Sequence, residues 1–338
     1  MKPTLGKVLP LFCIVAFPVA CLAQEFSAVP DGEFDPGKLE MHAMMCPAAV
    51  SEVNGKINYS GGSMNSDEGH NFDGSITFPI MRHFGFQADA LYSRIGSEDF
   101  YGGAGHLFAR DPDLGLIGFT GGYLDRKGVN TYQFGAEGEW YLNRLTLGAF
   151  AGVGKISYDN AAPFIDTNPT RLIGRVSADY YLTDDLRVGA SYTTAFHDNL
   201  YKGQAEYQTP MRGVALTAEV AGGDNGYDHW LVGVTYYFGG NKSLRDRQRR
   251  DDPPSMMPQI THGLGVYGAE YNRKGNEYLA ANPGAGNLGG GFGVVIRNGF
   301  GDGWDNVGLG ALKGVNRNRN TTVTPLPPMP PTRQSLQQ

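Results

Sequence analysis

The chain has 338 residues, of which 49 are glycine, while charged residues make up only 18% and aromatic residues 12%. The glycine share is roughly twice the usual ~7%, which is unusual for a soluble enzyme. Mean hydropathy is -0.31, and outside the N-terminus no run of about 18 apolar residues occurs, which excludes a polytopic helical membrane protein but not a transmembrane β-barrel.

The N-terminus predicts export. A positive start at Lys2 and Lys7 is followed by an apolar run over residues 8–22 and a small-residue cleavage site. This order is typical of a secretory signal peptide, here residues 1–23, so the mature chain is expected to begin at Gln24.

Cysteine usage and charge exclude two further classes. Once the signal peptide is removed, Cys46 is the one remaining cysteine, so a disulfide scaffold is excluded and Cys46 is interpreted as an incidental residue. Acidic residues prevail over residues 24–240 and basic residues over residues 241–338. The acidic part offers no basic face, so nucleic acid is not expected as a partner.

The sequence divides into the signal peptide, a polar periplasmic leader at residues 24–49, a strand-patterned region at 50–239 and a tail at 240–338. In the third segment apolar and polar residues alternate with period 2, and Gly, Asn, Asp or Pro separate the runs. One run, for example, has an aromatic face opposite Gln133, Glu137 and Glu139. Twelve strands are predicted, within a range of ten to fourteen, at residues 52–60, 73–80, 84–94, 100–109, 115–124, 130–142, 145–157, 171–182, 186–197, 200–209, 213–221 and 229–238.

The fold class predicted from this pattern is all-β, an antiparallel transmembrane β-barrel of about 12 strands with a Gly/Pro-rich, mostly irregular C-terminal tail. Short connections are expected to alternate with longer ones at Gly61–Asn71, Asp159–Thr170 and Gly222–Asp228. Outer-membrane barrels have their short turns in the periplasm. An even strand count then places both ends of the barrel there as well.

Three aromatic triplets end strands next to short connections, at residues 140–142, 180–182 and 236–238. Such residues suit the headgroup level of a membrane. The last triplet lies in Gly-Val-Thr-Tyr-Tyr-Phe at 233–238, which resembles the Gly-x-x-aromatic-x-aromatic signal of Gram-negative outer-membrane β-barrels. The resemblance covers residues 50–239 and implies an outer-membrane location, lipid and lipopolysaccharide as neighbours, and recognition of Gly233, Tyr236 and Phe238 by the barrel assembly machinery. The segment departs from the pattern because a long tail follows it and because Leu231 stands where a polar residue is usual.

A barrel of about twelve strands encloses a narrow lumen. Cations and anions nearly balance on its predicted inner face, so strong ion selectivity is not expected. Glu137 and Glu139 are expected to reach Arg171 or Arg175 across the small residues of the intervening strand. This would give either a constriction with a transverse field or ion pairs that only hold the wall together. The candidate pore-lining residues are Lys56, Asp89, Glu137, Glu139, Arg171, Arg175, Asp179, Arg187, Lys202, Glu206 and Glu219.

The function predicted is a narrow, weakly selective passive channel for small polar solutes. One alternative is a non-conducting structural barrel that uses its periplasmic tail to contact peptidoglycan or another periplasmic partner. The other is a rim-sited hydrolase built on His197-Asp198 or Asp228-His229, with His70 and His106 as further candidates. Catalysis is disfavoured, and the protein is not expected to be an enzyme, because adjacent strand residues point to opposite faces.

No cofactor and no metal site is expected. The acidic loops lack calcium-loop spacing, and the G-x-G-x-x-G match at residues 284–289 follows no strand. In the tail, the basic run Lys242–Arg250 and the Pro-rich residues 321–332 favour extended or disordered chain, and residues 263–314 are too poor in large apolar residues for a core. The tail is expected in the periplasm with the short turns.

Overall fold

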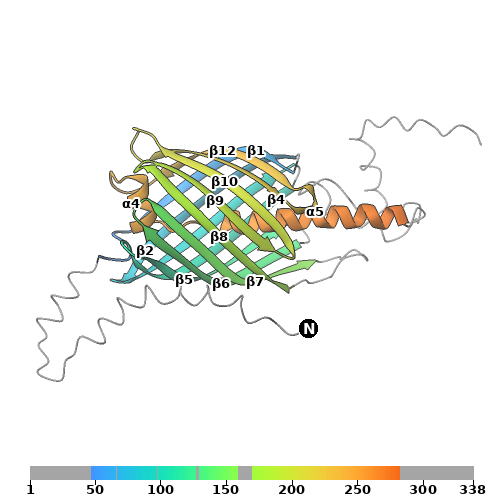
Figure 1. Cartoon of the computed structure of the whole chain (residues 1–338), viewed down its shortest axis with the longest axis horizontal. Helices are drawn as coiled ribbons and strands as arrows, with labels where there is room; N and C mark the ends of the chain where they lie inside the picture. Colours follow the sequence, from blue (N-terminus) through green and yellow to red (C-terminus); the bar gives the residue numbers. More distant parts are fainter. Residues whose placement is uncertain (1–46, 66, 97, 127–128, 159–169, 282–338) are drawn as a thin grey trace, which may run out of the picture.

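A computed structural model describes residues 47–65, 67–96, 98–126, 129–158 and 170–281 (Figure 1). The predicted signal peptide, nearly all of the leader with Cys46, and residues 282–338 lie outside this part of the chain. The strands are β1 Asn54–Met64, β2 Asp67–Met81, β3 Phe84–Ile95, β4 Glu98–Asp111, β5 Gly115–Arg126, β6 Val129–Leu142, β7 Leu145–Tyr158, β8 Thr170–Thr183, β9 Leu186–Ala195, β10 Asp198–Gln208, β11 Val214–Gly223 and β12 Asp228–Tyr237.

The twelve strands form a closed barrel in which each pairs antiparallel with its neighbours in the chain, and β1 pairs with β12 to complete the ring. The predicted fold class and strand count are confirmed. The large apolar residues of the period-2 pattern face outward, as shown by Phe134 at 59% exposed and Leu172 at 80%. An apolar outer surface is what a barrel needs in order to lie in lipid.

The two ends of the barrel differ in what they carry. The terminal rim, as we call it, holds both ends of the barrel and the turns at residues 82–83, 112–114, 143–144, 184–185 and 209–213. The opposite rim holds the connections at residues 65–66, 96–97, 127–128, 159–169, 196–197 and 224–227, the longest of which joins β7 to β8.

The prediction of a long connection at Gly61–Asn71 is wrong. Strands β1 and β2 stay paired through Gly61 with His70 and as far as Met64 with Asp67. Backbone pairing continues here because every backbone donor and acceptor needs a partner whatever its side chain. The extension of both strands could not be predicted because the small and polar residues of this stretch lack the apolar alternation that marks a strand.

After the barrel the chain forms two helices, α4 at Leu244–Arg250 and α5 at Met257–Ala281, and a short 3-10 turn, η2 at Asp224–Gly226, precedes β12. The prediction of irregular chain after Gly240 is therefore wrong for these two segments. Neither α4 nor α5 combines the length and apolar character that a bilayer-crossing helix needs, and no other described helix does. A side-chain cap explains the start of α4: Ser243 Oγ accepts from the Asp246 backbone N–H at 3.2 Å.

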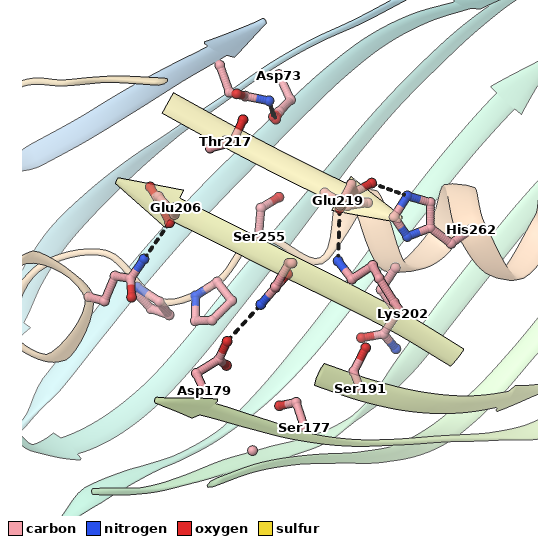
Figure 2. A pocket seen from close by; sticks show the side chains of 18 of the residues that line it. Asp73, Ser177, Asp179, Ser191, Lys202, Glu206, Thr217, Glu219, Ser255 and His262 are labelled. Carbon is pink, nitrogen blue, oxygen red and sulfur yellow. Dashed lines mark hydrogen bonds and ion pairs between the residues drawn. The ribbon is translucent and has the colours of Figure 1, made fainter. Parts of the chain in front are cut away.

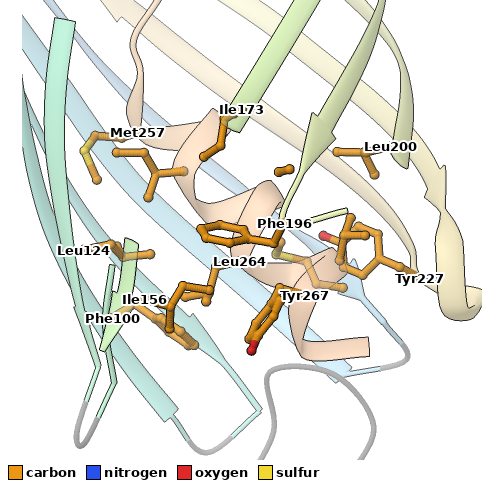
Figure 3. Packing of buried hydrophobic residues seen from close by; sticks show 14 of the residues in the cluster. Phe100, Leu124, Ile156, Ile173, Phe196, Leu200, Tyr227, Met257, Leu264 and Tyr267 are labelled. Atoms are coloured by element: carbon orange, nitrogen blue, oxygen red, sulfur yellow. The ribbon is translucent and has the colours of Figure 1, made fainter. Parts of the chain in front are cut away.

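Helix α5 starts inside the barrel and extends beyond the opposite rim (Figure 1). Its buried apolar residues Met257, Ile260, Leu264 and Tyr267 are spaced three, four and three residues apart, which places them on one helix face. They pack against wall residues near the opposite rim, among them Phe100, Leu124, Ile156, Ile173, Phe196 and Tyr227 (Figure 3). The expectation that the tail stays on the side of the short turns is wrong for this helix.

Glycines in the wall make room for α5. A methyl group at Gly122 would lie 2.5 Å from Ile260 Cδ1, and one at Gly102 would lie 2.2 Å from Met257 Cε. The lack of side chains at these positions in β5 and β4 thus allows the helix to pack closely against the wall. Each buried aliphatic or methionine side chain stabilises the seated helix by roughly 1.5–3 kcal/mol relative to an exposed one.

Candidate functional site

A cavity of about 240 Å³ remains in the lumen between the wall, α4 and residues 252–262 (Figure 2). It lies on the side of the terminal rim, whereas α5 fills the lumen towards the opposite rim. Nine of the predicted pore-lining residues line this cavity. They are Lys56, Glu137, Glu139, Arg175, Asp179, Arg187, Lys202, Glu206 and Glu219.

The other two predicted residues lie elsewhere. Asp89 is buried, and its Oδ2 accepts hydrogen bonds from Ser255 Oγ at 2.8 Å and from the Met256 backbone N–H at 3.0 Å. It therefore holds the chain where α5 begins. Arg171 lies in β8 near the opposite rim and donates from Nε to His197 Nε2 over 2.9 Å.

Several of the charges that line the cavity are paired within the wall. Arg187 contacts Asp179 at 3.2 Å and Glu206 at 2.8 Å. Lys202 contacts Glu219 at 3.1 Å. These pairs cancel opposite charges over short distances. The lining as a whole holds more carboxylates than cations, because Asp73, Glu137, Glu139 and Asp252 also line the cavity while Lys56 and Arg175 are its further cations.

The expected group of Glu137, Glu139, Arg171 and Arg175 forms only in part. Glu137 lies opposite Phe150 of β7, and Phe150 lies opposite Arg175 of β8, so Glu137 and Arg175 flank that ring. Glu137 is held instead by His106 Nδ1 at 2.8 Å, and Glu139 accepts from its neighbour in the strand, the Tyr141 hydroxyl. Arg171 is outside the cavity.

The link between α4 and α5 is tied to the inner wall. Thr77 Oγ1 donates to Asp252 Oδ1 over 3.1 Å, and the carbonyl of Pro253 accepts from Gln87 Nε2 and Lys56 Nζ, each at 3.2 Å. Burial raises the pKa of the Asp252 carboxyl, although the Lys56 charge and the Thr77 hydrogen bond act against it. This segment fixes where α5 enters the lumen.

The aromatic triplets have a second role that the sequence did not indicate. Their outer members, such as Trp140, are exposed, whereas the middle residues Tyr141, Tyr181 and Tyr237 are buried on the inside. The Arg249 guanidinium lies 5.0 Å from the Tyr141 ring centroid and 5.3 Å from that of Tyr181. The middle tyrosines thus receive α4 through cation–π contacts.

Lys242 joins α4 to the start of the barrel. Its Nζ donates to Asp251 Oδ2 at 2.9 Å and to Glu52 Oε1 at 3.1 Å. Burial would lower the pKa of the Lys242 ammonium, but the hydrogen bonds with Asp251 and Glu52 raise it above its usual value. Lys242 therefore ties the segment that leads into α4 to the chain just before β1.

The two histidine dipeptides considered for a hydrolase do not form dyads. His229 is buried and Asp228 exposed, as strand alternation requires. His197 accepts from a cation, Arg171, and Asp198 accepts from Asn225 Nδ2 at 2.9 Å. Of the other two candidates, His106 lies in the wall between Asp89 and Glu137, and His70 is at the barrel exterior beside Tyr59 and Glu68.

His229 meets residues that the sequence could not group with it. Its Nε2 lies 3.3 Å from Glu219 Oε1, and His262 Nε2 of α5 lies 3.1 Å from the same oxygen. His262 was not identified as a candidate because no helix was predicted there. The available signal was the spacing of Met257, Ile260 and Leu264, which marks one face of a helix and leaves His262 on another face.

The predicted assembly signal lies at the end of β12. Tyr236 and Phe238 are exposed at the barrel exterior, with ring centroids 5.1 Å apart in a T-shaped contact. At Gly233 a methyl group would lie 2.5 Å from the Tyr59 carbonyl oxygen. Recognition of these residues by the assembly machinery stays a prediction.

No family model and no curated protein matches the chain. Among solved structures, the barrel is similar to the KdgM porin, with 14% identity, coverage of 54% of this chain and 99% of that one, and a TM-score of 0.41. The outer membrane protein Omp33 of Acinetobacter baumannii matches with 15% identity, coverage of 55% and 99%, and a TM-score of 0.39. The NanC porin matches with 9% identity, coverage of 53% and 98%, and a TM-score of 0.43. The chain itself is a closed twelve-strand antiparallel barrel.

Proposed function

We propose that the protein is an outer-membrane channel that its own C-terminal segment closes, and that it passes small polar solutes only when α5 leaves its seat. The observation that carries this proposal is the position of α5 in the lumen, with its apolar face packed on the inner wall. A polar cavity lies behind this helix on the side of the terminal rim. Removal of α5 would join that cavity to the opposite rim.

The remaining features agree with weak selectivity. Arg187 and Lys202 are each paired with a carboxylate of the wall, so these pairs themselves attract neither sign of solute strongly. The apolar exterior supports outer-membrane lipid and lipopolysaccharide as neighbours, and the end of β12 supports insertion by the barrel assembly machinery. No nucleic acid partner, cofactor or enzymatic activity is proposed. The route of α5 gives no support to a periplasmic partner of the tail.

A disulfide lock tests the proposal. A Cβ atom built at Gly263 of α5 would lie 3.5 Å from the Cβ of Ala195 at the end of β9, which is within the range that a disulfide bridges. The double variant Ala195→Cys, Gly263→Cys is made in a Cys46→Ser background with the chain starting at Gln24. Single-channel current is then recorded in planar bilayers before and after reduction.

The expected result is a silent oxidised protein that gives discrete conductance steps after reduction, with the wild type gating in both conditions. The single variant Gly263→Cys is the control for effects of the reductant. Conductance that is the same in the oxidised lock and in the wild type would show that solutes pass beside a seated α5. Silence in all forms, from protein shown to be folded, would favour the non-conducting structural barrel.

A further inference from the structure

Three side chains from three elements converge on one point of the lumen. Glu219 comes from β11, His229 from β12 and His262 from α5 (the first and third are shown in Figure 2). One carboxylate oxygen and one ring nitrogen from each histidine lie within 4.8 Å of one another. Both histidine side chains are buried, at 0% exposed for His229 and 5% for His262.

The ligand set and its spacing suit a divalent transition metal. Zinc sites commonly use two histidines and one carboxylate with one open position, with metal–ligand distances of about 2.0–2.2 Å. In a tetrahedron with such bonds, neighbouring ligand atoms lie roughly 3.3 Å apart. The Glu219 Oε1 atom lies 3.3 Å from His229 Nε2 and 3.1 Å from His262 Nε2. Two of the three edges are therefore already at the length that a bound ion requires.

A second observation points to a ligand. In the part of the chain that the structure describes, His229 Nε2 is buried and lies 3.3 Å from Glu219 Oε1 without meeting the geometry of a hydrogen bond. A buried polar atom without a well-formed hydrogen bond destabilises the fold. A metal ion would satisfy this nitrogen through its lone pair.

Neighbouring residues orient the ligands. The Tyr227 hydroxyl lies 3.0 Å from His229 Nδ1, which leaves Nε2 as the free nitrogen, as an outer-shell partner of a metal-bound histidine does. Lys202 Nζ donates to Glu219 Oε2 at 3.1 Å and so leaves Oε1 to the histidines. The ammonium group also opposes a cation by Coulomb repulsion, which provides a distinctive test.

We propose that Glu219, His229 and His262 bind one divalent transition-metal ion of the zinc class, which ties α5 to the barrel wall. Because one ligand lies on the helix and two lie on adjacent strands, the ion would stabilise the seated position of α5. This consequence rests on the proposed closure of the channel, whereas the binding of the ion does not.

The test measures metal binding by the full mature protein folded in detergent. Zn²⁺ is titrated by calorimetry, and Co²⁺ is titrated as a probe whose visible absorption reports four-coordinate geometry. The expected result is one ion per chain. His262→Gln and His229→Gln should each weaken Zn²⁺ binding by more than about 100-fold, since loss of even an outer-shell partner costs 10–100-fold.

Two further variants separate a metal site from an ion-pair cluster. His70→Gln, a histidine on the barrel exterior beside Tyr59 and Glu68, is the matched control and should leave affinity and stoichiometry unchanged. Lys202→Met removes the repelling charge and should tighten binding, whereas a cluster that only stabilises the fold would give no tighter binding. Heat-modifiable mobility in SDS gels confirms that each variant is folded.

Absence of saturable binding to the wild type, or equal affinity in His262→Gln and wild type, would overturn the inference. Conductance is then recorded with and without Zn²⁺. Metal binding by a protein that never conducts would overturn the proposed channel but leave the metal site in place. Conductance without any metal binding would overturn the metal site but leave the proposed channel in place, so the two failures are distinguishable.

Discussion

At the scale of single residues, a buried arginine connects the C-terminal segment to the barrel. Arg247 of α4 is 1% exposed. It donates to Gln208 Oε1 at 3.1 Å, to the Gly239 carbonyl at 2.9 Å and to the Gly240 carbonyl at 2.8 Å. Its guanidinium also lies 5.3 Å from the Tyr237 ring centroid. A planar donor group with several fixed acceptors is what arginine supplies and lysine does not.

Replacing this arginine tests how much the contacts stabilise the fold. Arg247→Met keeps the apolar stem but leaves the two carbonyls without their donor, so it should lower the free energy of unfolding by about 2–3 kcal/mol. The measurement is urea-induced unfolding of the protein in lipid vesicles. Arg245→Met on the same helix removes a pair with Asp184 in which the two side chains are 28% and 50% exposed, and it should cost less than about 1 kcal/mol. Equal losses in the two variants would contradict this account.

At the scale of elements, the strands were predictable and the helices were not. Period-2 alternation marks a strand that has lipid on one side and a polar lumen on the other. It made all twelve strands predictable, although β1 and β2 lose it where they pair between Gly61 and Asn71. Helix α5 has an equally regular apolar spacing over residues 257–267, but that stretch contains Gly263 and Gly265 and is followed by Gly268, and glycine disfavours a helix. Packing inside the lumen outweighs that preference.

For the same reason, site residues on strands could be predicted and those on helices could not. Candidates on strands were placed on the inner face because alternation fixes the side to which a residue points. The position of His262 depends on a helix that inserts from another part of the chain, and no local pattern reports such an insertion. Asp89 was correctly placed inside, yet its role in holding Ser255 and Met256 depends on the same insertion.

A charge placed on the seated face of α5 tests whether that face closes the channel. Ile260 is fully buried against the wall, so Ile260→Asp puts a carboxylate among apolar atoms at a cost of several kcal/mol. Because each 1.4 kcal/mol changes an equilibrium tenfold, the open fraction should rise by about 100-fold or more. Single-channel recording in planar bilayers measures it.

The adjacent Gln259 provides the matched control because its side chain lines the cavity rather than the apolar seat. Gln259→Glu adds one negative charge to the lumen without unseating the helix, so the open fraction should stay near that of the wild type. If both variants open the channel equally, the added charge and not the loss of packing is responsible.

At the scale of the whole molecule, the chain crosses from one side of the barrel to the other after its last strand. Helix α4 covers the terminal rim, where Arg249 donates to the Asn143 carbonyl at 2.6 Å. Helix α5 reaches the opposite rim, where Arg273 donates to Asn225 Oδ1 at 2.8 Å. One covalent path through the lumen therefore joins the two rims of the barrel.

Chemical labelling of intact cells tests this topology. If the terminal rim faces the periplasm, as the short turns of outer-membrane barrels do, the end of α5 lies at the cell surface. Glu277, whose side chain is 64% exposed beyond the opposite rim, is changed to Cys, and Asp113, at 71% on the terminal rim, is changed in a second variant. Both carry Cys46→Ser. A membrane-impermeant maleimide should label Glu277→Cys on intact cells and Asp113→Cys only after the outer membrane is permeabilised. The reverse pattern would place α5 in the periplasm, and it would mean that the barrel is inserted with its longest connection, residues 159–169, on the inner side.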